Sequence, residues 1–185
     1  MGYHAYGTDI SEKMVEYSSK NLEWLKEKNF FLGHFGGYDR ELGRSARDDG
    51  PERPVSQKKC FFSISQGDAT SFQWEQPIDA VACEGYLGKP MSQIPTEIKL
   101  KTEKQQCSAI ILGFLKNLAP QIKKDTPVVI AVPAWLRPNG TYERLEILAF
   151  LEDLGYNVNN KTREGLIYCR EKQIVARDIL ILRKT

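Results

Sequence analysis

Two aspartates stand where short apolar segments give way to polar ones. Asp9 follows the segment 4–8, and Ser11 with an acid behind it is typical of a helix N-cap and first turn. Asp68 follows another apolar run, in the stretch ISQGDATSF. Ligands of open parallel α/β sheets bind beyond the carboxyl ends of the strands, where an acid commonly accepts ribose hydroxyls. Asp9 could therefore accept a ribose and Asp68 the exocyclic amine of an adenine, or each could simply cap a helix or turn.

A third candidate stretch, DAVACEGYLGKP, runs from an apolar segment directly into Cys83, Glu84, Gly85 and Tyr86. A carboxylate and an aromatic ring thus follow the end of a further expected strand. Both residues also have a purely structural interpretation. Glu84 could point to solvent or pair with Lys89, and Tyr86 could pack under a turn.

The elements that must position these residues alternate along the chain. Apolar runs predict strands at 4–8, 60–65, 78–83 and 127–136, the last of them fully buried. Apolar residues at helical spacing predict helices at 11–28 and 97–118, and a third from Thr141 to Gly155 that buries Leu145, Leu148, Leu151 and Leu154. The tail, GLIYCREKQIVARDILILRK, predicts an antiparallel pair. This order predicts an α/β protein with a doubly wound, mostly parallel sheet and a terminal antiparallel strand pair.

Composition excludes several classes of protein. With 185 residues and 41% hydrophobic content, we expect a single domain over 1–185, with a flexible insertion at about 33–59. The net charge of +2 argues against nucleic-acid binding by bulk electrostatics, and the arginines of the insertion are largely cancelled by its acids. The four cysteines form no CxxC pair and there are two histidines, so no metal site or disulfide framework is expected. The longest apolar run, 109–115, is too short for a membrane span, which favours a cytoplasmic protein.

The three stretches GTDIS, GDATSF and CEGYLG, with QIVARDILIL at the end, resemble the Class I S-adenosylmethionine-dependent methyltransferases that modify exocyclic amines of bases. Their order and spacing are similar to the catalytic domain of tRNA guanosine N2-methyltransferases that also carry a THUMP module. The resemblance spans most of residues 4–184, outside the insertion. It implies a Rossmann-like methyltransferase fold, S-adenosyl-L-methionine as cofactor, tRNA as partner and no metal.

The resemblance also implies roles for individual residues. Asp9, with Ile10 beside it, would meet the ribose of the cofactor; Asp68 would meet its adenine, with Ala69 beside the ring. The catalytic loop, Cys83, Glu84, Gly85 and Tyr86, would hold the target base. Tyr86 would stack on a base flipped out of the RNA. Ionised Glu84 only accepts hydrogen bonds, so it fits the adjacent N1–H and N2 donors of guanine better than the edge of adenine.

Two departures from this pattern carry expectations of their own. Gly85 stands where a proline is usual, so we expect a looser loop. The first strand of the family, with its glycine-rich turn, has no counterpart and would lie before residue 1. We therefore expect an N-terminally truncated domain with an altered sheet, weak cofactor binding, no activity in isolation and self-association through exposed edges.

Two other functions remain open at this stage. A non-catalytic binding or scaffold module could keep the fold without the cofactor site. A nicotinamide dinucleotide domain also places an acid after its second strand, but it gives no reason for CEGYLG or for the terminal antiparallel pair, and ranks last.

Overall fold

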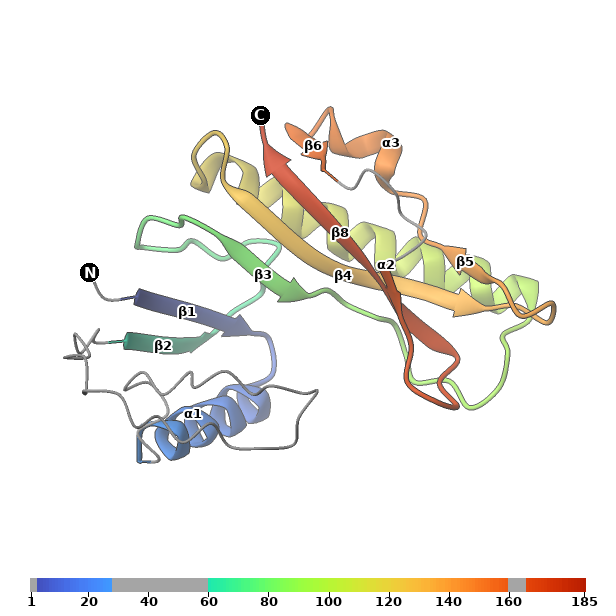
Figure 1. Cartoon of the computed structure of the whole chain (residues 1–185), viewed down its shortest axis with the longest axis horizontal. Coiled ribbons are helices and arrows are strands. Elements are labelled where there is room, and N and C mark those ends of the chain that lie inside the picture. The colour runs from blue at the N-terminus through green and yellow to red at the C-terminus, as the bar shows by residue number, and fades with distance from the viewer. Residues whose placement is uncertain (1–2, 28–59, 160–165) are drawn as a thin grey trace, which may run out of the picture. The chain divides into compact units, whose positions relative to one another are not determined.

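The computed structural model describes residues 3–27, 60–159 and 166–185, and the predicted insertion at 33–59 lies outside them (Figure 1). The chain divides into two compact units, Met1–Ala69 and Thr70–Thr185, which we call unit 1 and unit 2 and describe separately.

Unit 1 contains strand β1 (Tyr3–Asp9), helix α1 (Glu12–Glu27) and strand β2 (Cys60–Gln66). The two strands pair in parallel, and their register places Asp9 opposite Gln66. The half-buried residues Val15, Leu22 and Leu25 share one face of α1, as the periodicity predicts, but no described side chain in this unit is fully buried. The predicted strands at 4–8 and 60–65 and the helix at 11–28 are confirmed to within a residue or two at each end.

Unit 2 is built on a mixed sheet with the strand order β3-β4-β8-β6, in which β5 also pairs with β4 and β7 with β8. The strands are β3 (Val81–Glu84), β4 (Pro127–Leu136), β5 (Tyr142–Arg144), β6 (Tyr156–Val158), β7 (Ile167–Tyr168) and β8 (Val175–Lys184). β3 and β4 are parallel, whereas the pairings of β5, β6, β7 and β8 are antiparallel. The predicted terminal antiparallel pair is therefore confirmed as β7 and β8.

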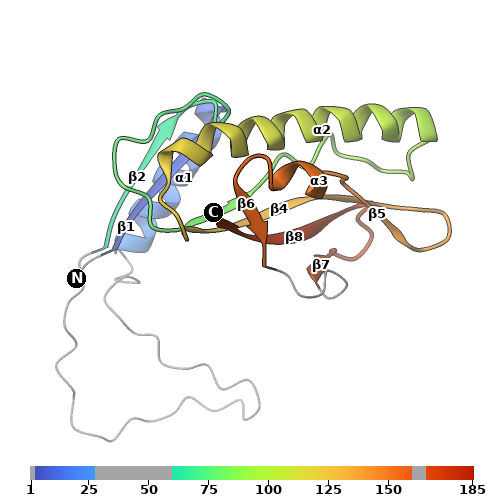
Figure 2. The same cartoon turned by 90° about the horizontal axis from the view of Figure 1, so that it is seen from above.

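Helix α2 (Glu97–Leu118) lies along one face of this sheet, where the core of the unit is found, and ends in a short 3₁₀ turn at Ala119–Gln121 (Figure 2). Its buried residues recur every three or four positions, namely Leu100, Glu103, Cys107, Ile111, Phe114, Leu115 and Leu118. Alternate residues of β4 and β8 are buried, including Ile130 and Leu180, which lie opposite each other. Burial in β4 is thus alternating along most of its length, whereas the sequence predicts a fully buried strand.

The predicted third helix is wrong over most of its length. Residues 142–144 instead form β5, which turns back on β4 through a hairpin whose tip, Gly140, has a φ of 82°. The turn closes through the hydrogen bond from Arg137 N–H to Thr141 O, 2.8 Å long. Asn-Gly is a strong hairpin signal, and here it prevails over the leucine periodicity. Only a single turn, α3 (Leu148–Leu151), is helical, and of the four leucines expected in the core, Leu145 and Leu151 are buried.

Two smaller predictions in this region have different outcomes. The strand predicted at 78–83 is shorter at its start, because Ile78 makes only an isolated bridge to Ile122 before β3 begins at Val81. The helix end predicted at Gly155 is wrong, because α3 ends at Leu151 with Glu152 as its C-cap; Gly155, with a φ of 80°, instead lies in the turn that follows, where its N–H donates to Glu152 O.

Candidate functional site

Asp9 lies at the carboxyl end of β1 and caps the turn into α1. Its Oδ1 accepts the N–H of Ser11 at 2.8 Å, and Ser11 O in turn accepts the N–H groups of Met14 and Val15. This is an Asx turn ahead of the helix: Ser11 is the N-cap residue, so Asp9 orders the turn into α1 but accepts no N–H of the helix itself. The half-buried carboxylate still has a second oxygen, Oδ2, that could accept a hydroxyl donor.

The other three predicted cofactor residues gather at the same edge of the β1–β2 pair. Gly67 N–H donates to Asp9 O at 3.0 Å, and Asp68 follows as the next residue, exposed, with Ala69 behind it. The side chain of Ile10 is 69% exposed, and its carbonyl oxygen accepts from Gln66 Nε2 at 3.2 Å. The parallel pairing thus brings the two carboxylates to one edge, as the sequence predicts, with an exposed apolar side chain beside them.

The second predicted group lies in unit 2, at the carboxyl end of β3. Gly85 N–H donates to Ala131 O at 2.8 Å, and a Cβ built on Gly85 would lie 2.9 Å from that same oxygen. A proline here would lose the donor, and any side chain would collide with the backbone of β4. Gly85 thus has a role that the comparison with proline missed, because a glycine permits this close contact with the backbone of β4, whereas the looser loop expected from it stays a prediction.

Glu84 has a partner that sequence reasoning missed. Its Oε1 forms an ion pair with Arg177 Nε of β8, and Arg177 Nη1 also donates to Gln173 Oε1 at 3.4 Å. Glu84 thus neither stands alone in solvent nor pairs with Lys89, although its side chain is 55% exposed. The two residues are 93 positions apart, and no local pattern in the sequence could have joined them.

Cys83 and Tyr86 are the other two side chains of this loop, one immediately before Glu84 and one two residues after it. Burial raises the pKa of the Cys83 thiol to about 11, so the thiol is protonated at neutral pH and is a poor nucleophile. The side chain of Tyr86 is 38% exposed, an arrangement that leaves part of the ring able to contact a ligand. The site therefore suits binding and orientation of a substrate better than covalent catalysis.

Glu103 is a second residue that sequence reasoning missed. It is only 5% exposed, within the otherwise apolar stripe of α2, and its Oε2 accepts the N–H of Lys89 at 3.4 Å. The sequence did contain a signal for this burial. Glu103 lies four residues before Cys107, so helical spacing places this acid on the predicted apolar face of the helix.

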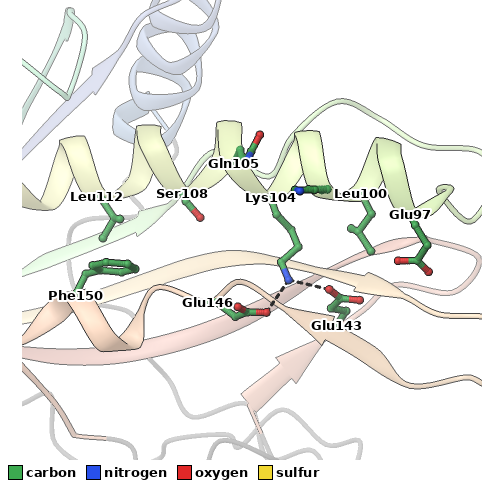
Figure 3. Close-up of a pocket in the computed structure, with 10 residues that line it drawn as sticks. Glu97, Leu100, Lys104, Gln105, Ser108, Leu112, Glu143, Glu146 and Phe150 are labelled. Carbon is green, nitrogen blue, oxygen red and sulfur yellow. Dashed lines mark hydrogen bonds and ion pairs between the residues drawn. The ribbon is translucent and has the colours of Figure 1, made fainter.

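A groove of about 560 Å³ lies between α2 and the segment 143–150, and none of the predicted site residues lines it (Figure 3). Lys104 Nζ bridges Glu143 and Glu146 at 2.7 and 2.8 Å across this groove. Partial burial disfavours the charged lysine, but its hydrogen bonds to the two glutamates outweigh this effect and raise its pKa. The hydrogen bond to Lys104 in turn lowers the pKa of Glu146. These charges satisfy one another and fasten the 143–146 segment to α2.

The described parts of the chain contain neither a cluster of metal-binding side chains nor a helix that could span a membrane. Residues 3–27, 60–159 and 166–185 contain no group of three or more His, Cys, Asp or Glu side chains placed to hold a metal ion. Within the same ranges, every helix is too short or too polar to cross a bilayer.

Comparison with solved structures identifies the fold. The crystal structure of magnesium protoporphyrin IX methyltransferase from Synechocystis PCC 6803 with bound SAH matches with a TM-score of 0.50 and 15% identity. The match covers 97% of this chain but only 63% of that enzyme. A SAM-dependent methyltransferase from Methanosarcina mazei matches with a TM-score of 0.52 and 10% identity, over 99% of this chain and 82% of that one. The chain thus has the Rossmann-like fold of Class I methyltransferases. It matches no protein-family model and no curated protein sequence.

Proposed function

We propose that this chain is an S-adenosylmethionine-dependent methyltransferase domain that acts on an exocyclic amine of a base in RNA, with guanosine N2 in tRNA as its preferred target. The observation that carries the proposal is the loop Cys83–Tyr86. It stands at the carboxyl end of a parallel strand in a methyltransferase fold, with a carboxylate and a partly exposed aromatic ring.

Unit 1 provides the groups that would hold the cofactor. Asp9 would accept ribose hydroxyls through its carboxylate, and Asp68 would accept the amine of the adenine. The exposed side chain of Ile10 and the neighbouring Ala69 would cover the faces of the adenosine. Both carboxylates lie at one edge of the β1–β2 pair, and this placement fits an adenosine, which presents donors at both ends.

The Cys83–Tyr86 loop would hold the base for in-line transfer. The lone pair of the guanine N2 amine is delocalised into the ring, so acceptors must orient the amine toward the sulfonium methyl that the bound cofactor supplies. Glu84 would accept from N1–H and N2, while Tyr86 would stack on the flipped base. The thiol of Cys83, protonated at neutral pH, takes no part as a nucleophile.

Transfer of a labelled methyl group to bulk tRNA tests this function. The assay uses millimolar S-adenosylmethionine and enzyme in excess over tRNA, so that even a weak affinity for the cofactor would not hide the transfer. Digestion of the tRNA should release N2-methylguanosine, and Tyr86→Ala should abolish the signal without changing cofactor binding. Lys123→Ala, an exposed lysine outside the loop, serves as the control variant.

Other outcomes of this assay would overturn parts of the proposal. Label in a different nucleoside would overturn the guanosine assignment. Cofactor binding without any transfer, or no cofactor binding at all, would instead favour a scaffold module that keeps the fold. The RNA partner and a cytoplasmic location are parts of the same proposal. If tRNA is not methylated, neither of them is supported any longer.

A further inference from the structure

Glu103 is a buried acid in a helix face that is otherwise apolar. The face consists of residues such as Leu100, Cys107 and Ile111, each no more than 1% exposed, and Glu103 itself is 5% exposed. Placing a carboxylate in such a position costs free energy unless the group makes compensating interactions. The interactions of Glu103 therefore indicate what its burial serves.

The hydrogen bond of Glu103 is made to the loop that carries Tyr86. Its Oε2 accepts the N–H of Lys89, three residues after Tyr86. The same oxygen lies 3.0 Å from the position that a Cβ on Gly88 would occupy, and Gly88 has a φ of 84°. Only glycine readily adopts this backbone angle, and here it also leaves room for the carboxylate. The loop and the acid are thus matched to each other.

The neighbour of Glu103 on the helix is a cysteine. Cys107 Sγ lies 3.4 Å from that same Cβ position, next to the carboxylate. Burial and, to a lesser degree, the charge of Glu103 raise the pKa of the Cys107 thiol to about 11. The thiol is therefore neutral at physiological pH and adds no second negative charge beside the loop.

We infer that Glu103 is a positioning residue, which anchors residues 86–90 to α2 and thereby sets the place of the Tyr86 ring that holds the target base. The loop is then fixed at both ends, by Ala131 O at Gly85 N–H and by Glu103 at Lys89 N–H. The anchor itself rests on contacts within unit 2, whereas its role toward a base rests on the proposed function.

Hydrogen exchange tests the anchor without cofactor or RNA. In Glu103→Ala, exchange of the Lys89 amide should rise about tenfold or more because its acceptor is lost, and the amides of residues 86–88 should exchange faster with it. Glu103→Gln keeps an acceptor oxygen and should restore most of the protection. Gly88→Ala displaces the carboxylate from the loop side and should reproduce the local rise. Glu97→Ala, on the same helix but in its exposed first turn, is the matched control.

A spectroscopic signal reports on Tyr86 itself. After incorporation of 3-fluorotyrosine, the ¹⁹F resonance of Tyr86 is identified by its loss in Tyr86→Phe. This resonance should shift in Glu103→Ala, return toward its original position in Glu103→Gln and stay unchanged in Glu97→Ala. Because glutamine also fills the space of glutamate, Glu103→Met, which keeps the length of the side chain but has no acceptor oxygen, separates the two roles: the resonance should stay shifted if the hydrogen bond to Lys89 matters and should return if Glu103 only fills space.

The possible outcomes separate the anchor from the proposed function. Unchanged exchange in 86–90, or a rise spread over α2, β4 and β8, would overturn the inference by showing no anchor or only general packing. If the anchor is found but Glu103→Ala methylates tRNA as well as the wild type while Tyr86→Ala does not, the positioning role is overturned. If the wild type transfers no methyl group at all, the proposed function fails and the anchor of the loop stands.

Discussion

Asp9 has one carboxylate oxygen committed to the chain itself and one that is open to a ligand. Asp9→Asn keeps the acceptor for the Ser11 N–H but removes the charge, whereas Asp9→Ala removes both. We expect Asp9→Ala to lower the free energy of unfolding by about 1 kcal/mol, and Asp9→Asn to change it by much less. Both should weaken S-adenosylmethionine binding, the alanine variant by about tenfold. Urea unfolding measures the change in stability and equilibrium dialysis the change in affinity. Normal affinity in Asp9→Asn would leave Asp9 only its structural role in the turn before α1.

Glu84 has a similar division of roles, because its Oε1 is held by Arg177. Glu84→Gln keeps the size of the side chain and replaces the charge by an amide that cannot accept at both positions. We expect guanosine methylation to fall by roughly ten- to a hundredfold, as for loss of a charge-assisted hydrogen bond, with cofactor affinity unchanged. The labelled-methyl assay on bulk tRNA measures the effect. Undiminished methylation would remove Glu84 from base recognition.

The space around Gly85 and the hydrogen bond of its N–H restrict which residues can occupy this position. Gly85→Ala would place a Cβ 2.9 Å from Ala131 O, so β3 and β4 would have to separate at this point. We expect the free energy of unfolding to fall by about 1–3 kcal/mol, measured by urea denaturation. The control is Gly7→Ala, whose Cβ would make ordinary contacts of 3.4 Å or more with Ile64. Equal effects of the two substitutions would show that the close contact at Gly85 is unimportant.

At the scale of elements, the sequence predicted helices and strands best in segments where a single hydrophobic pattern favoured a single structure. Helix α2 and strand β4 match their predicted bounds, because a long apolar periodicity and an uninterrupted apolar run have few alternative structures. The helix predicted over 141–155 was wrong because two patterns conflicted there. The spacing of the leucines favoured a helix, the Asn-Gly turn favoured a hairpin, and the structure has the hairpin that pairs β5 with β4. The Glu84–Arg177 pair could not be predicted, because it depends on how β3 and β8 are placed around β4.

The bridge from Lys104 on α2 to Glu143 and Glu146 should make the attachment of the 143–146 segment sensitive to acid. The folded pKa of Glu146 is lowered, so its contribution to stability is present above its ordinary pKa of 4.5 and is lost as the pH falls through the folded value. We therefore expect Lys104→Met to be less stable than the wild type at pH 7, and the difference to narrow below pH 4.5. Urea unfolding at pH 7 and pH 3.5 tests this. If wild type and Lys104→Met differed equally in the free energy of unfolding at both pH values, the ion pairs of Lys104 would be excluded as the cause of that difference.

At the scale of the whole molecule, the buried core is unevenly distributed. Every fully buried apolar side chain of the described residues belongs to unit 2, whereas unit 1 has a two-stranded sheet and one helix that is at most half-buried. Two strands alone are marginally stable in water. We expect amides of β1 and β2 to exchange much faster than those of β4 and β8, as followed by mass spectrometry.

Added S-adenosylmethionine should slow exchange in unit 1 if Asp9 and Asp68 bind it, because a ligand stabilises the state that holds it. Inosine at the same concentration is the control, because it lacks both the methionine of the cofactor and the exocyclic amine that Asp68 would accept. Protection confined to unit 2 would place the cofactor elsewhere.

The long pairing of β4 with β8 also has a consequence during synthesis on the ribosome. β4 is a ten-residue apolar strand, and its partner along nine residues begins only at Val175, well after β4 ends at Leu136. At roughly 5–20 residues per second, one edge of β4 is left without that partner for about 2–8 s. During this time the nascent chain exposes an edge that can pair with other chains. The proline at position 133, within the strand, removes one backbone donor and so limits such mispairing until β8 emerges.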